Sequence, residues 1–152
     1  MTIYHTSAEK IEEIYEDGVF GTHIFFASEI YVMTGGDYVV YEIEINDDDI
    51  LRATSMFYDE NWALALPAVE EVKQRFSVDD QTAMDLLDES KFLHELIKED
   101  EIVDHDDSWW IQKMTAKAAK MMGYSAVAVQ DETGISYMLD LKVYKEMMKL
   151  QE

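Results

Sequence analysis

The sequence contains no cysteine and a single proline, Pro67. Without cysteine, the protein can form no disulfide, thiolate metal site or cysteine nucleophile, so the fold must rely on packing alone. No apolar stretch approaches the roughly 20 residues that a membrane-spanning helix needs. The start, Met-Thr-Ile-Tyr-His, lacks a basic segment followed by an apolar run. We therefore expect a protein that stays in a reducing cytoplasm.

Basic residues are also scarce. Twelve lysines and arginines stand against 33 acidic residues, which gives a formal net charge of -21. Such a charge repels phosphate backbones and anionic lipid surfaces, so we expect no direct contact with nucleic acid or membrane. A macromolecular partner should present a basic surface. The alternative is that the acidity serves only to keep the protein soluble.

The chain of 152 residues is 48% hydrophobic, which suits one domain over residues 1–152 with a real core. Apolar and alternating patterns predict strands at residues 3–4, 24–27, 38–45, 126–129 and 137–141. Helical spacing of apolar residues predicts a helical insertion around 60–104 and a helix that begins after Ser108 and ends at Gly123. It also predicts a final helix with Tyr144, Met147 and Met148. The sequence therefore predicts the α+β class.

Two acidic runs, residues 47–49 and 104–107, invite a metal-binding interpretation. Neither has the spaced ligands and the turn glycine of a calcium loop. Solvated acidic turns explain both runs, and we expect no metal.

One ordered set of residues carries chemical information: Tyr4, His5, Thr6 and Ser7, then Phe25, Phe26, Ala27 and Tyr31, and near the end Gln130, Asp131 and Glu132. A histidine at a strand end can bond a ribose hydroxyl, small hydroxyl neighbours leave room for a carboxamide, and an aromatic face can stack on a nicotinamide ring. Taken singly, the histidine and the aromatics are ordinary core residues, and the polar triplet is an ordinary hairpin tip. Taken together, they indicate a dinucleotide-binding cleft.

The stretches YHTSAEKIEEIYEDGVFGTHIFFASEIY and GYSAVAVQDETGISYMLDL follow the order of motifs in ADP-ribosyltransferases of the diphtheria-toxin-like and polymerase-like class. Within that superfamily the chain most resembles the phage anti-CRISPR ADP-ribosyltransferases that inhibit the type I-F Cascade (Csy) complex. The resemblance implies an ADP-ribosyltransferase-like domain with split mixed and antiparallel sheets and flanking helices. It also implies NAD as co-substrate, a bacterial host cytoplasm, and an asparagine of a DNA-binding Cascade subunit as acceptor.

Carried over residue by residue, the resemblance puts His5 on the adenosine-side ribose. The backbone of Thr6 would meet the nicotinamide carboxamide, with Ser7 supporting the turn. Phe26 and Tyr31 are the two candidates for stacking on the nicotinamide ring.

The acidic residue follows from the late motif. Gln130 and Glu132 are two apart on an extended segment and so point to the same side, which resembles the Gln-x-Glu element of transferases that modify side-chain amides. Glu132 would stabilise the oxocarbenium character that develops as the nicotinamide bond breaks, with Asp131 as the alternative acid. Gln130 would hold the acceptor.

Two hypotheses of different class follow from the sequence. The first is an NAD-dependent mono-ADP-ribosyltransferase that blocks target DNA recognition by Cascade. The second is a non-enzymatic inhibitor that binds a nucleic-acid-binding protein stoichiometrically as an acidic DNA mimic.

Overall fold

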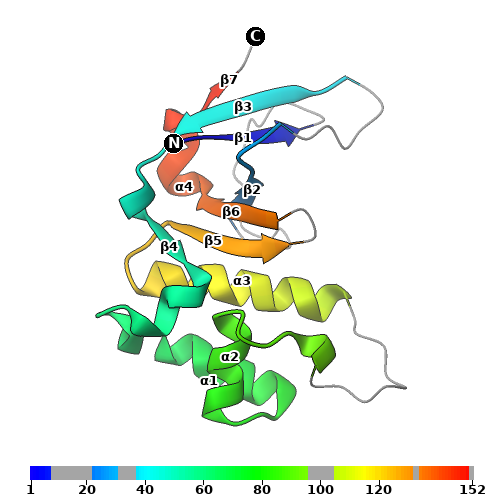
Figure 1. Cartoon of the computed structure of the whole chain (residues 1–152), viewed down its shortest axis with the longest axis vertical. Helices are drawn as coiled ribbons and strands as arrows, with labels where there is room; N and C mark the ends of the chain where they lie inside the picture. The colour runs from blue at the N-terminus through cyan, green and yellow to red at the C-terminus, as the bar shows by residue number, and fades with distance from the viewer. Residues whose placement is uncertain (8–21, 31–36, 96–104, 132–133, 151–152) are drawn as a thin grey trace.

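A computed structural model describes residues 1–7, 22–30, 37–95, 105–131 and 134–150. It stacks a three-stranded sheet, a four-stranded sheet and a layer of helices along the long axis of the molecule (Figure 1). The α+β class with split sheets and flanking helices, predicted from the sequence, is confirmed. None of the described helices combines the length and apolar character needed to cross a membrane.

The three-stranded sheet has the order β1-β3-β7 and is antiparallel. Strand β1 (Thr2–Ser7) pairs along its whole length with β3 (Val39–Glu44), so that His5 lies opposite Tyr41. The short strand β7 (Lys149–Leu150) pairs with the far edge of β3.

The four-stranded sheet has the order β2-β6-β5-β4 and is mixed. Strands β5 (Ala126–Asp131) and β6 (Gly134–Asp140) form an antiparallel pair, with β2 (His23–Phe26) antiparallel on the outer side of β6. On the other side, β4 (Ile50–Arg52) runs parallel to β5, with Arg52 opposite Ala128. Gly134, at the start of β6, has a φ of 116°, a conformation that favours glycine.

Helix α3 (His105–Met121) packs against one face of the four-stranded sheet, and α1 (Leu66–Phe76) and α2 (Asp80–Leu87) pack against α3 (Figure 1). Their buried side chains form one core cluster with Leu51, Val127 and Val129 of the sheet. Short 3-10 helices, η2 (Ala53–Tyr58) and η3 (Trp62–Ala65), lead from β4 into α1, and η4 (Leu93–Glu95) follows α2. The predicted helical insertion around 60–104 is therefore present in its described part.

A second core cluster lies between the two sheets. Ile3 and Ile43 from the three-stranded sheet pack with Phe26, Ile50 and Leu139 from the four-stranded sheet. Phe26, Ile50 and Leu139 alternate along their strands with residues of the helical core, because successive side chains of a strand point to opposite faces. Both faces of the four-stranded sheet are consequently buried, one by helices and one by the other sheet.

The predicted final helix is present only in part. Helix α4 (Leu141–Tyr144) is a single turn, the 3-10 turn η5 (Lys145–Met147) follows it, and the chain then becomes β7. Pairing of Lys149 with Glu42 across the sheet edge competes with helix continuation at this point. Helix α3 also begins earlier than the predicted start after Ser108, at His105.

Asp140, at the end of β6, is a fully buried carboxylate that connects β6 to neighbouring elements. Its Oδ1 accepts hydrogen bonds from the Thr22 hydroxyl at 2.7 Å and the Lys142 backbone N–H at 3.0 Å, and Lys120 Nζ lies 2.6 Å from Oδ2. Burial alone would raise the pKa of Asp140, but these three contacts outweigh it and hold the pKa below its usual range. Asp140 therefore ties β6 to α3 and caps α4.

We predict that Asp140→Asn lowers the free energy of unfolding at pH 7 by about 1–3 kcal/mol, because charged hydrogen bonds to a buried group are lost. Urea denaturation monitored by circular dichroism measures this change. Asp48→Asn, in an exposed acidic turn, is the matched control and should change the value by less than about 0.5 kcal/mol. Equal effects of the two substitutions would contradict the role given to Asp140.

Candidate functional site

Among the described residues, one isolated bridge joins the two sheets, between Tyr4 of β1 and Ala27, the residue after β2. Each residue donates its backbone N–H to the carbonyl of the other, both at 2.8 Å. Two segments of the predicted cofactor set, Tyr4–Ser7 and Phe25–Ala27, are thus side by side although about 20 positions separate them in the chain. The bridge marks the seam between the sheets.

His5 lies on this seam, largely buried. Its Nδ1 is 2.6 Å from the carbonyl oxygen of Phe25. A carbonyl only accepts, so Nδ1 carries the proton of this hydrogen bond. Burial lowers the pKa of His5 below the ordinary 6.5, and the bond to the Phe25 backbone opposes this only in part. The imidazole is therefore neutral at pH 7, with Nε2 as a hydrogen-bond acceptor.

The aromatic residues of the seam have different environments. Phe26 is 1% exposed and belongs to the core between the sheets, with its ring centroid 5.6 Å from that of His5. Phe25 is half-buried and faces the helical core. Phe26 thus packs against the ring of His5. Because Phe26 is buried, little of its side chain is accessible to a ligand. Tyr31, the other stacking candidate, lies outside the described residues.

Thr6 and Ser7 continue β1 beyond His5 and pair with Val40 and Val39. Both are half-buried. Their side chains point to opposite faces of the sheet, as alternation requires, so only one of the two shares the orientation of Tyr4.

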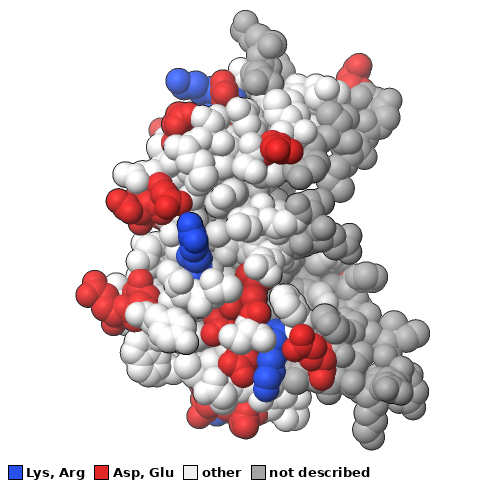
Figure 2. Space-filling view, viewed as in Figure 1, with Lys and Arg blue, Asp and Glu red and all other residues white. Residues whose placement is uncertain are grey.

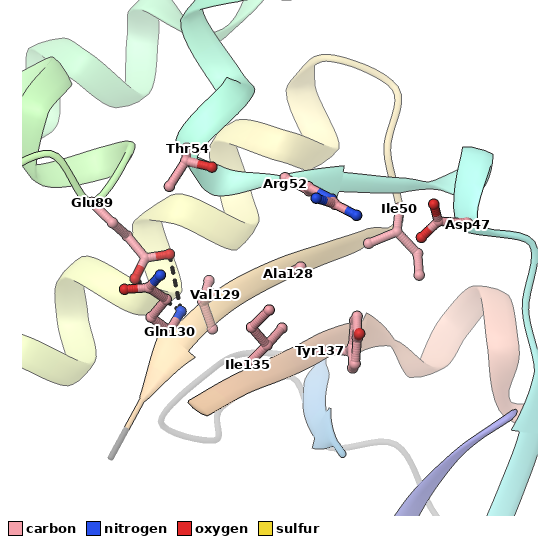
Figure 3. Close-up of a pocket in the computed structure, with 10 residues that line it drawn as sticks. All are labelled: Asp47, Ile50, Arg52, Thr54, Glu89, Ala128, Val129, Gln130, Ile135 and Tyr137. Carbon is pink, nitrogen blue, oxygen red and sulfur yellow. Dashed lines mark hydrogen bonds between the residues drawn. The ribbon is translucent and has the colours of Figure 1, made fainter. Parts of the chain in front are cut away.

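A cavity of about 190 Å³ opens on the face of the four-stranded sheet that meets the other sheet. Its floor is formed by Ala128 of β5 and by Tyr137 and Ile135 of β6, with Ile50 and Arg52 of β4 along one side (Figure 3). Ala128, Tyr137 and Ile50 also border the core between the sheets, so the cavity extends that core outward.

Strand β2 connects His5 to the cavity, because β2 is bridged to β1 at Tyr4–Ala27 and pairs with β6 of the cavity floor. His5 itself does not line the cavity, but Phe26, which contacts its ring, pairs with Tyr137 of the cavity floor. Two strand spacings, about 10 Å, separate β1 from β6 at this level.

The first residue of the polar triplet, Gln130, lies at one end of the same cavity. Gln130 is exposed, pairs with Ile135 across the hairpin and lines the cavity, and the backbone of Asp131 pairs with Gly134. Glu132 lies outside the described residues. The structure therefore brings the Gln130 end of β5 onto the face that also carries the His5 seam.

Glu89 holds the end of β5 in place. Strand β4 ends opposite Ala128, so no strand continues to accept the backbone N–H of Gln130 on that side. The carboxylate of Glu89 takes that role with both oxygens, at 2.9 and 3.1 Å (Figure 3). An unpaired strand-edge N–H is thereby satisfied by a side chain from the helical layer.

The backbone of Glu89 adopts an unfavourable conformation to do this. It follows the C-cap of α2, Asp88, and has a φ of 65°, in the left-handed region where glycine is usual after a helix. A residue with a side chain costs free energy there. A glycine at position 89 would relieve this cost but would lose the hydrogen bonds to the Gln130 N–H.

Charge around the cavity is mostly negative. Figure 2 shows acidic side chains spread over this face, with basic side chains as isolated spots. Arg52 is the only cation that lines the cavity among the described residues, and no described carboxylate lies within ion-pair distance of it. In the part of the chain that the structure describes, no group of three His, Asp or Glu side chains could hold a metal ion.

Arg52, Glu89 and Tyr137 are among the cavity residues that were not singled out as site residues from the sequence. Tyr137 follows from the alternation of β6, which puts it on the same face as Ile135 and Leu139. Arg52 follows the apolar pair Ile50-Leu51, and Glu89 stands in the polar stretch of residues 88–91. No local pattern distinguishes either from a solvated side chain.

The family model of the Anti-CRISPR Type I-F ADP-ribosyltransferase AcrIF11 matches residues 1–146. The chain belongs to this family. Membership in the AcrIF11 family confirms the predicted ADP-ribosyltransferase activity with NAD as co-substrate and an anti-CRISPR role directed at a CRISPR-Cas protein.

The fold has a counterpart among solved structures. A crystal structure of an anti-CRISPR protein is similar with a TM-score of 0.58 over 91% of this chain and 88% of that chain, at 21% sequence identity. At this identity the likeness concerns the fold alone. No curated protein matches the sequence significantly.

We predict that Glu89→Gly keeps the turn after α2 but frees the Gln130 amide, because glycine accepts the left-handed backbone and has no carboxylate. Amide hydrogen exchange of Gln130, measured by NMR, should accelerate about tenfold or more. Glu89→Gln, which retains one acceptor oxygen, serves as the matched control and should give a smaller change. Unchanged exchange in Glu89→Gly would show that the amide is protected by something else.

The environment of His5 predicts a pH dependence of stability. Its pKa is lowered in the folded state, so the unfolded chain takes up a proton first, near pH 6.5. The contribution of neutral His5 to stability is therefore complete above about pH 6.5 and is lost as the pH falls toward the folded-state pKa. Urea unfolding of wild type and His5→Asn over this range should show a shallower decline for the variant, which keeps an N–H donor but does not titrate. Parallel pH profiles would refute the assignment.

Proposed function

We propose that the protein transfers ADP-ribose from NAD to an asparagine side chain of a DNA-binding subunit of the type I-F Cascade complex and so blocks recognition of target DNA. The observation that carries this proposal is the arrangement at the sheet seam. The His5 segment and the Phe25–Ala27 segment meet there, and the cavity floor leads from them to Gln130. An extended dinucleotide is long enough to contact both ends.

The residues present suit an anionic nucleotide despite the acidity of the chain. Nε2 of neutral His5 can accept a hydrogen bond from a ribose hydroxyl. Thr6 would offer its backbone to the carboxamide, with Ser7 supporting it and Tyr4 and Ala27 holding the seam. Arg52 is placed to meet phosphate charge at the cavity wall. Tyr31 is our choice for stacking on the nicotinamide, because Phe26 is buried in the core.

The acid and the acceptor site belong to the end of β5. Bound NAD supplies the ADP-ribosyl group and a nicotinamide that leaves with the bonding electrons. Glu132 would lie beside the ribose hydroxyls and stabilise the positive charge that grows as that bond breaks, with Asp131 as the alternative acid. Gln130, exposed at the cavity end, would hold the acceptor carboxamide by its own amide.

The consequence for the target follows from charge. A DNA-binding subunit presents basic surface, which the net charge of -21 attracts. The transferred group carries a pyrophosphate, so a modified DNA-binding site would repel the phosphate backbone. One adduct at the right residue is enough.

Incubation of the protein with NAD and purified type I-F Cascade, followed by mass spectrometry of each subunit, tests the proposal. We expect one subunit to gain the mass of one ADP-ribose, with fragment ions that place it on an asparagine. Omission of NAD is the control. Inhibition at one-to-one stoichiometry without any mass gain would instead support the acidic DNA mimic.

We predict that Glu132→Gln lowers the rate of transfer about 100-fold or more while leaving the folded state intact. Initial rates of subunit modification measure the effect, with Glu146→Gln in the exposed η5 turn as the matched control. If Glu132→Gln retains the wild-type rate and Asp131→Asn does not, the acid is Asp131. Full activity of both variants, and of Gln130→Ala, would move the catalytic centre away from this hairpin.

A further inference from the structure

An exposed apolar segment adjoins the cavity. Between residues 58 and 66 the chain turns four large apolar side chains to solvent: Tyr58, Trp62, Leu64 and Leu66. Tyr58 is 90% exposed, the highest value among the exposed large apolar side chains of the described residues. We refer to these four residues as the apolar rim. Apolar groups gathered at the surface in this way are typical of a protein interaction site.

The backbone beneath the apolar rim is firmly held. Met56 and Ala65, on either side of the exposed residues, are fully buried in the helical core. Asp59 accepts hydrogen bonds from the Tyr124 hydroxyl at 2.7 Å and from the Asn61 backbone N–H at 2.8 Å. A partner that covers the rim therefore pays little for ordering the backbone.

The position of the apolar rim relates it to the candidate site. Arg52 and Thr54 line the cavity, and η2, which begins at Ala53, carries the chain from there directly to Tyr58. Figure 3 shows Thr54 and Arg52 projecting from this stretch beside the β5 floor. A protein seated on the rim would lie next to the cavity mouth.

Charge identifies the kind of partner. Carboxylates flank the rim at Asp59 and Glu60, and the exposed acidic turn of residues 47–49 lies on the other side of β4. Anionic lipid and nucleic acid are repelled by this surface, and so is a second copy of a chain with charge -21. A protein with basic surface around an apolar contact is attracted by it.

We infer that the apolar rim is the docking surface for the protein acceptor, and that it binds the basic, DNA-binding face of that acceptor. This inference rests on the proposed function and names the part of the surface that selects the substrate protein. Tyr58 and Trp62 are the expected anchors, since tyrosine and tryptophan dominate binding energy at protein interfaces.

The test compares two activities of the double variant Tyr58→Ala/Trp62→Ala. We expect kcat/KM for modification of purified Cascade to fall about thirtyfold or more. Hydrolysis of NAD by the protein alone should stay within about twofold of wild type, because neither residue lines the cavity. Trp109→Ala is the matched control, since Trp109 is 44% exposed against 40% for Trp62 but lies on α3. That variant should retain both activities.

Several results would overturn the inference. Unchanged modification by the double variant would do so, and so would an equal fall in NAD hydrolysis, which would place these residues in the nucleotide site or the fold. Sedimentation that shows a wild-type dimer lost in the variant would make the rim a self-association surface. If wild type transfers nothing to Cascade, the proposed function fails separately. In that case, biolayer interferometry of wild type and variant on immobilised Cascade tests the docking surface. Equal binding of wild type and variant, or no binding of wild type, would reject the apolar rim as the docking surface.

Discussion

The two hydrogen bonds between Tyr4 and Ala27 are the interaction on which the candidate site depends. They join an outer strand of one sheet to the end of a strand in the other, at the one level where the backbones of the two described sheets are bridged. The bridge also brings the neighbouring residues together. The ring of His5 contacts that of Phe26, and its Nδ1 is hydrogen-bonded to the backbone carbonyl of Phe25. Away from the bridge, side chains rather than hydrogen bonds fill the space between the sheets. A ligand-sized opening can therefore exist only where those side chains become small or stop, as they do at Ala128.

The helical layer does more than cover the sheet. The end of α2 sends Glu89 to the edge of β5, just beyond the last residue of β4, and its carboxylate satisfies the Gln130 amide there. A continued β4 would have supplied the same hydrogen bond but would also have covered the cavity wall. Because β4 is short, that wall stays open. The hydrogen bond to the Gln130 N–H comes instead from Glu89, whose left-handed backbone is unfavourable for a residue with a side chain. The position of the β5 end is thus coupled to the packing of α1, α2 and α3.

Much of the fold could be predicted because its longer elements have local periodic patterns. Strands β1, β2, β3, β5 and β6 and the helical insertion all show them. Strands β4 and β7, three and two residues long, are too short for alternation to be recognised, and their pairing partners are remote in sequence. The site divides in the same way. Contiguous segments such as Tyr4–Ser7 could be found from the sequence, whereas Arg52 and Glu89 acquire their places only through tertiary packing.

The net charge of -21 at first opposes an anionic co-substrate. Distance resolves the conflict, since exposed charges further apart than about 8 Å are largely screened at physiological ionic strength. What matters within the cavity is its own lining, which holds two carboxylates, Asp47 and Glu89, and one cation, Arg52. The Glu89 carboxylate accepts the backbone N–H of Gln130, whereas Arg52 has no ion-pair partner among the described residues. His5 is neutral because burial lowers its pKa, so it adds an acceptor without adding charge. Most of the other acidic side chains lie on the outer surface, where they attract a basic macromolecule. One strongly acidic chain can in this way bind a small anion and attract a basic protein at the same time.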